Sequence, residues 1–152
     1  MLLDQRLIVI MIHYERDFYG WTQEQAALLR AGRLDDLDVS NLIEEIESMG
    51  RSERRELQSR LTVLLVHLLK WRFQPARRGR SWQLTLEEQR DKCLDVLQDN
   101  PSLSSKLGDI LVRSYSQARL VASRETGIDR DDFPPACPWT YEQIIDIAYY
   151  PD

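Results

Sequence analysis

Two pairs of carboxylates in the sequence have a spacing that suits a divalent cation. Glu44 and Glu47 are three residues apart within the run EEIE, and Glu88 and Asp91 are three residues apart within EEQRD. Residues at this spacing share one face of a helix, and carboxylates from two facing helices can bind Mg²⁺. If the two pairs converge, they form a site where a metal ion assists the attack of water on a phosphate.

The carboxylate pattern is loosely similar to that of all-helical nucleotide pyrophosphatases, although the spacing within EEIE and EEQRD differs from theirs. The competing interpretation is a solvated helix face on which acidic and basic side chains form ion pairs that contribute little individually. We favour the solvated face. A metal-dependent nucleotide phosphohydrolase remains an alternative function.

A second segment interleaves five basic residues with three aromatic ones between positions 70 and 82. Arginine can bind a phosphate through two hydrogen bonds, and aromatic rings can stack on bases, so the segment is a candidate nucleic-acid or anion site. The structural interpretation, which we favour, is that the rings close the core at helix ends and the arginines reach terminal carbonyls or acidic neighbours. The candidate residues are Lys70, Trp71, Arg72, Arg77, Arg78, Arg80 and Trp82.

His67 is the remaining polar candidate, and it lies among apolar residues such as Leu64 and Leu68. We favour a hydrogen-bonded core or interface histidine over a ligand or a general base. Neither His13 nor His67 has the Glu-x-x-His spacing of a di-iron bundle. The sequence also contains no recognisable nucleophile motif and no Gly-rich phosphate loop. It therefore favours a non-enzymatic role, and we expect no bound cofactor.

Composition indicates one compact domain. The chain has 152 residues, 43 % of them hydrophobic and 30 % charged, with six glycines and six prolines, which disfavours the disordered and fibrous classes. Cys93 and Cys137 are far apart and outside any CxxC motif, which favours a reducing compartment. The apolar run at residues 7–12 is too short to span a membrane and lacks a cleavage site. We expect a cytoplasmic protein that does not enter a membrane.

The charge distribution is uneven along the chain. Residues 1–50 carry four basic and ten acidic side chains, residues 51–92 carry eleven and five, and residues 93–152 carry five and ten. A basic region can bind polyanions. Because acidic regions flank it, we favour ion pairing within the fold or across a dimer.

Apolar residues recur with a period of about 3.6, which predicts an all-α helical bundle of about five helices. No segment alternates with the period of a strand, so we predict no sheet. The expected helices run from Tyr14 to about Arg30, from a Ser40 cap to just before Pro75, from Ser81 or Thr85 to Asn100, from Leu103 to Gly127, and from a Thr140–Gln143 capping box through Ala148.

The long central helix carries the strongest signal. Gly50 either splits it or only weakens it. Between Leu61 and Leu69 apolar residues point in nearly every direction, which indicates a helix wrapped by neighbours or placed in an oligomer interface. We therefore predict a small helical interaction or regulatory module that self-associates or binds a protein partner.

Five motifs occur in order along the chain: DFYGWTQEQAALLRAGR, NLIEEIESMGRSERREL, HLLKWRFQP, SWQLTLEEQR and FPPACPWTYEQIID. Together they resemble the bacterial domain-of-unknown-function family numbered twenty-nine, over about residues 14–150. The resemblance implies an all-helical fold and no assigned activity. Gly20 is a departure, because a bulkier residue is more usual there.

The first ten residues follow no helical period. We expect residues 1–13 to be a disordered extension of a single 1–152 domain, or a non-native one if translation naturally begins at Met11.

Overall fold

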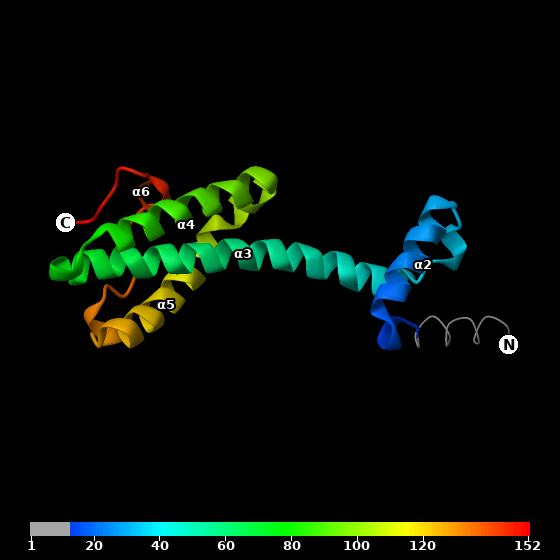
Figure 1. The fold of residues 1–152 in the computed structure, drawn as a ribbon, viewed down its shortest axis with the longest axis horizontal. Coiled ribbons are helices and arrows are strands. Elements are labelled where there is room, and N and C mark those ends of the chain that lie inside the picture. Colours follow the sequence, from blue (N-terminus) through cyan, green and yellow to red (C-terminus); the bar gives the residue numbers. More distant parts are fainter. Residues whose placement is uncertain (1–12) are drawn as a thin grey trace. The chain divides into compact units, whose positions relative to one another are not determined.

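The computed structural model describes residues 13–152 and is all-α, which confirms the predicted bundle with one long central helix (Figure 1). No strand occurs within these residues. Residues 1–12 of the expected N-terminal extension lie outside the described range. The α-helices are α2 (Phe18–Arg30), α3 (Val39–Phe73), α4 (Arg80–Asp99), α5 (Leu107–Thr126) and α6 (Tyr141–Ile145), and the 3₁₀ helices are η1 (Leu34–Asp36), η2 (Pro75–Arg77), η3 (Pro101–Lys106) and η4 (Arg130–Asp132).

The chain forms two compact units, Met1–Gly50 and Arg51–Asp152, called here unit 1 and unit 2. Helix α3 continues through the boundary, so Gly50 does not break it. The expectation of a single domain stays a prediction. Within residues 13–152, no helix has both the length and the apolar character needed to cross a membrane.

Unit 1 is built around Trp21, a buried residue of α2. Its indole nitrogen donates a hydrogen bond to Oδ2 of Asp38, at 3.0 Å. Asp38 immediately precedes α3 and also accepts from the Asn41 side chain at 2.8 Å. The predicted Ser40 cap is therefore wrong by two residues, because the Asp38 carboxylate already serves the start of α3.

The predicted end of the first helix is confirmed at Arg30, and Gly32 follows with φ +68°. Residues 13–16, which include Tyr14, are helical as expected, but the helix is interrupted at Asp17, so α2 itself begins at Phe18. The carboxylate of Asp17 accepts a hydrogen bond from the Gly20 amide at 2.9 Å and so caps the first turn.

Unit 2 encloses the leucine-rich half of α3. Six of its leucines are fully buried, and side chains from α4, α5 and the C-terminal segment pack around them. Neighbouring elements of the same chain therefore explain why the apolar residues between Leu61 and Leu69 point in nearly every direction. The leucines are Leu57, Leu61, Leu64, Leu65, Leu68 and Leu69.

The connections of unit 2 follow local signals. Helix α4 ends at Asp99 before Pro101. Helix α5 ends at Thr126, and Gly127 follows it with a φ of +76° that requires glycine-like freedom. Residues 101–106 form a 3₁₀ helix instead of the expected first turn of α5. Ser104 and Ser105 donate back to backbone carbonyls there, which favours a tight turn over a regular helix.

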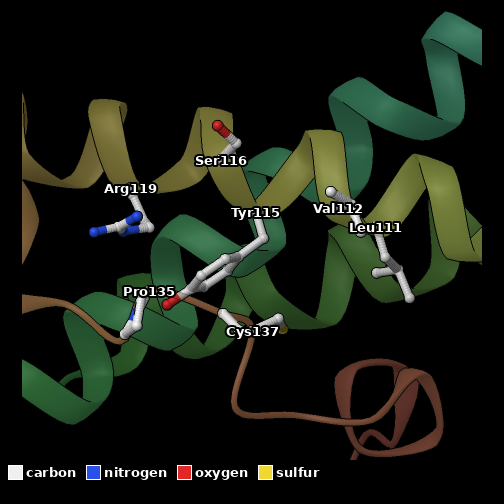
Figure 2. A pocket seen from close by; sticks show the side chains of 8 residues that line it. Leu111, Val112, Tyr115, Ser116, Arg119, Pro135 and Cys137 are labelled. Carbon is white, nitrogen blue, oxygen red and sulfur yellow. The ribbon is translucent and has the colours of Figure 1, made fainter.

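The C-terminal segment is held from two sides. Tyr115 of α5 donates its hydroxyl proton to the Pro134 carbonyl at 2.6 Å, next to Pro135 (Figure 2). The predicted Thr140–Gln143 capping box is present, but α6 ends at Ile145 rather than Ala148. Arg90 of α4 is buried and donates to the carbonyls of Ile144 and Tyr149 at 2.8 and 2.7 Å. Those bonds hold residues 146–149 outside a helix.

Candidate interaction surface and the other sequence-predicted sites

The predicted metal-binding carboxylates lie on two helices in different units. Glu44 and Glu47 share α3 in unit 1, and Glu88 and Asp91 share α4 in unit 2. Glu88 forms an ion pair with Lys92 at 2.8 Å, and this partner lowers the pKa of Glu88. Among residues 13–152 no three His, Cys, Asp or Glu side chains are grouped to hold a metal ion. Convergence of the two carboxylate pairs stays a prediction.

Several members of the basic and aromatic segment are engaged within unit 2. Lys70 forms an ion pair with Glu125. Arg78 donates its Nε proton to the Trp71 carbonyl at 2.6 Å and lies over the Trp71 ring. That ring also contacts Tyr150, with 4.7 Å between the centroids. These contacts support the structural interpretation for Lys70, Trp71 and Arg78.

The other members divide by exposure. Trp82 is half-buried and lies 5.9 Å from the Lys70 ammonium, measured to its ring centroid. Arg72, Arg77 and Arg80 are exposed at the same end of unit 2. Both tryptophans already have partners, so phosphate contacts by the exposed arginines fit this end better than base stacking. Nucleic-acid binding stays a prediction.

His67 is half-buried on α3, and its Nδ1 lies 2.9 Å from the Val63 carbonyl. Nδ1 is therefore the protonated nitrogen of the neutral ring, since a carbonyl only accepts. Burial lowers the pKa of His67 below its usual value. This environment matches the expected hydrogen-bonded histidine better than a general base facing a substrate.

The first three turns of α3 expose an apolar stripe, here called the α3 stripe and defined as Val39, Leu42, Ile43, Ile46 and Met49. The exposed fractions are 55 % for Val39, 52 % for Ile43, 66 % for Ile46 and 68 % for Met49, and Leu42 is half-buried. The members follow one another at three- and four-residue intervals, so they share one face of the helix. Unit 1 thus presents a continuous apolar surface.

The opposite face of α3 is polar along these turns and the next two. Glu44, Ser48, Arg51 and Arg55 recur at helical spacing and are exposed. A helix with one charged face and one apolar face normally buries the apolar face against another element. Within residues 13–152 the leucine half of α3 does this, whereas the α3 stripe keeps most of its area exposed.

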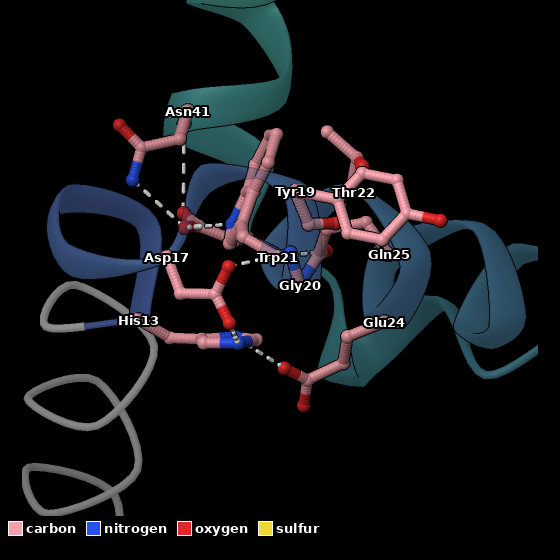
Figure 3. Close-up of polar contacts among 10 residues, drawn as sticks. His13, Asp17, Tyr19, Gly20, Trp21, Thr22, Glu24, Gln25 and Asn41 are labelled. Carbon is pink, nitrogen blue, oxygen red and sulfur yellow. Dashed lines mark hydrogen bonds and ion pairs between the residues drawn. The ribbon is translucent and has the colours of Figure 1, made fainter.

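Contacts on both sides fix α3 within unit 1. Tyr14 donates its hydroxyl proton to Oε1 of Glu45 at 2.5 Å, and this acceptor raises the pKa of Tyr14 to about 12. Gln25 accepts from the Asp38 amide at 2.8 Å. Together with the Trp21–Asp38 bond, these contacts hold the beginning of α3 against α2 (Figure 3). The α3 stripe is therefore carried on an ordered helix.

A polar cluster lies at the start of α2 (Figure 3). Nδ1 of His13 is 2.8 Å from Oε2 of Glu24, an ion-pair distance, although this nitrogen has no partner in hydrogen-bond geometry. Nε2 of His13 is 3.9 Å from Oδ2 of Asp17. A Cβ atom at Gly20 would lie only 2.8 Å from Nε2 of His13 and from Cγ of Asp17. The unexpected glycine is thus explained by this close approach.

The family model described as "Domain of unknown function DUF29" matches residues 13–150. This chain belongs to the DUF29 family. The match covers the described part of unit 1 and continues through unit 2 as far as Tyr150. It therefore includes the α3 stripe and the polar cluster of this DUF29 chain. No curated protein and no solved structure matches it.

The α3 stripe was only partly visible in the sequence of this DUF29 protein. Periodicity placed Leu42, Ile46 and Met49 on the central helix. The interface was instead predicted farther along this helix, between Leu61 and Leu69, because apolar residues are denser there. The spacing of apolar residues identifies the apolar faces of a helix, but it does not show which of these faces stays exposed. Placing the exposed face required knowing where α4 and α5 pack.

Proposed function

We propose that this protein is a self-associating helical interaction module that dimerises through the α3 stripe. The observation that carries the proposal is the exposure of four large apolar side chains along one face of a helix. Soluble proteins seldom leave contiguous apolar surface exposed without a binding role. The docking surface is thus expected in unit 1 and not at the buried leucines of unit 2.

The spacing of the α3 stripe suits a second α-helix. Val39, Leu42, Ile46 and Met49 occupy the a, d, a and d positions of a heptad. β-branched residues at a with leucine-like residues at d favour two-stranded pairing. A second copy of the chain brings an identical seam, so it satisfies this requirement without any other partner. Ile43 lies beside the seam and widens it.

The seam is short, so the expected dimer is weak. Burying the exposed half of each side chain stabilises it by roughly 1 kcal/mol, or roughly 8 kcal/mol for two copies. The loss of translational and rotational freedom offsets at least about 4 kcal/mol of this. At most about 4 kcal/mol remains, so we expect a reversible dimer with a dissociation constant of about 1 mM.

The test is sedimentation equilibrium of the full chain from about 10 µM to about 1 mM. The wild-type protein is expected to dimerise reversibly. Ile46→Glu is expected to remain monomeric, because its charge would have to be buried at the centre of the seam. Leu84→Glu is the matched control, since Leu84 is also exposed but lies on α4 in unit 2.

Circular dichroism melts establish that all variants fold. A wild-type protein that stays monomeric to the highest concentration would refute self-association. Equal weakening by Leu84→Glu and Ile46→Glu would show that the dimer does not use the α3 stripe.

We also infer a cytoplasmic location in a bacterial cell. Cys93 and Cys137 are both free thiols, which fits a reducing compartment.

A further inference from the structure

A pocket of about 260 Å³ lies in unit 2 between α5 and the segment that follows η4 (Figure 2). Its volume is slightly below the usual range for ligand sites, about 300–1,000 Å³, so it suits a small molecule. Most of its surface is apolar, with an arginine as its charged group. Its lining includes Leu111, Val112, Tyr115, Arg119, Pro135 and Cys137.

The walls of the pocket are fixed by buried contacts. Tyr115 is almost fully buried, and its hydroxyl group is bonded to the Pro134 carbonyl. Phe133 is also buried and packs edge-on against Phe73, with 5.2 Å between ring centroids. These anchors hold the segment carrying Pro135 against α5. The pocket is therefore formed before a ligand arrives.

Arg119 provides an incompletely satisfied cation in the pocket. Its side chain is only 17 % exposed. Nη2 donates to the Arg130 carbonyl at 3.1 Å and lies 3.7 Å from the Asp131 carboxylate, which is 79 % exposed. Nε is buried and has no hydrogen-bond partner within residues 13–152. Within these residues the charge of Arg119 is balanced only by one carbonyl and by this exposed carboxylate, so a ligand that brings an anion to the terminal nitrogens of Arg119 gains affinity.

A carboxylate matches this arrangement. It can accept from the two terminal nitrogens of Arg119 side by side. The Asp131 carboxylate is too exposed to neutralise the guanidinium fully. With Arg119 as its cation, the pocket suits one negative charge, and its apolar walls suit a hydrocarbon body.

We propose that this pocket binds a small apolar carboxylic acid, with its carboxylate on Arg119 and its hydrocarbon part against Tyr115, Leu111 and Pro135. The site lies within unit 2 and does not involve the α3 stripe. Whether a ligand binds in this pocket is therefore tested independently of whether the protein dimerises.

Cys137 gives the site an internal reporter. Its thiol lines the pocket, is half-buried and donates to the Trp139 carbonyl at 3.5 Å. The other cysteine, Cys93, is fully buried in the core. Alkylation at Cys137 is thus separable from Cys93 by peptide mass spectrometry, and a ligand in the pocket shields Cys137.

The experiment measures the binding of hexanoate, hexan-1-ol and inorganic phosphate by calorimetry. It also measures how far each compound protects Cys137 from alkylation by N-ethylmaleimide. Hexanoate is expected to bind and protect, while hexan-1-ol and phosphate bind at least about tenfold more weakly. Arg119→Gln is expected to weaken hexanoate binding by about tenfold or more and to leave hexan-1-ol unchanged. Arg113→Gln is the matched control, because Arg113 is an exposed arginine on the same helix.

A second variant tests the pocket without touching Arg119. Ala136→Trp places a large side chain at the pocket lining and is expected to abolish hexanoate binding. Three results would overturn the proposal: hexanoate that neither binds nor protects at about 10 mM, hexan-1-ol binding as strongly as hexanoate, or affinity unchanged by Arg119→Gln. Phosphate binding equal to that of hexanoate would also overturn it.

Discussion

Gly20 shows how a single residue constrains unit 1. In an ordinary helix interior, alanine in place of glycine stabilises a protein by about 1 kcal/mol. At Gly20 the added methyl group would collide with the Asp17 carboxylate and the His13 ring. Asp17 would have to leave the Gly20 amide that it caps, and losing such a cap costs about 1 kcal/mol.

We therefore expect Gly20→Ala to give no net stabilisation, whereas Gly50→Ala raises the free energy of unfolding by about 1 kcal/mol. Gly50 is the matched control, since it is a helical glycine with nothing within 4 Å of an added Cβ. Urea denaturation of dilute protein measures both. Equal stabilisation by the two substitutions would contradict the close approach at Gly20.

His67 makes stability depend on pH. Burial lowers its pKa in the folded chain below its unfolded value of about 6.5. The unfolded chain then binds the proton more readily, so the contribution of His67 to stability is present above about pH 6.5 and is lost as the pH falls below it. We expect His67→Gln to lose less stability than the wild type between about pH 7 and pH 5. The free energy of unfolding is measured by urea titration at the two pH values. An equal decrease for His67→Gln and the wild type would refute this prediction.

At the scale of elements, Arg90 joins α4 to the last segment of the chain. Its guanidinium donates to three carbonyls, those of Ile144, Ile147 and Tyr149, and it lies over the Tyr150 ring. Burial lowers the pKa of Arg90. The Ile144 carbonyl lies in the last turn of α6 and the other two carbonyls follow the helix, where unpaired acceptors attract a cation. One side chain thus serves the end of a five-residue helix that has little stability of its own.

We expect Arg90→Met to lower the free energy of unfolding by about 3 kcal/mol, because several charge-assisted hydrogen bonds to buried carbonyls are lost. Hydrogen exchange is expected to rise first at residues 144–150. Arg113→Met, at an exposed position of α5, should leave both quantities nearly unchanged. Unaltered exchange in the C-terminal segment of the Arg90 variant would show that α6 is held by its apolar contacts alone.

At the scale of the whole molecule, the helices were predictable because each one carries its own periodic pattern. Gly127 and the Thr140–Gln143 capping box were also identifiable, since those signals are local. Arg90 and Arg119 were missed. The farthest carbonyl bound by Arg90 is 59 residues away, and a carbonyl group is the same in every residue type, so no side-chain pattern marks it.

The contacts of Arg90 also affect the order in which the protein can fold during translation. Unit 1 depends on partners close along the chain, such as Trp21 with Asp38, so it can form as soon as α3 begins to leave the ribosome. The leucines of α3 emerge from the ribosome long before Tyr149. The hydrogen bond from Arg90 to the Tyr149 carbonyl can therefore form only at the end of synthesis. Until α4 and α5 have been made, the nascent chain therefore exposes the apolar side chains of α3, and a chaperone can bind them during that time.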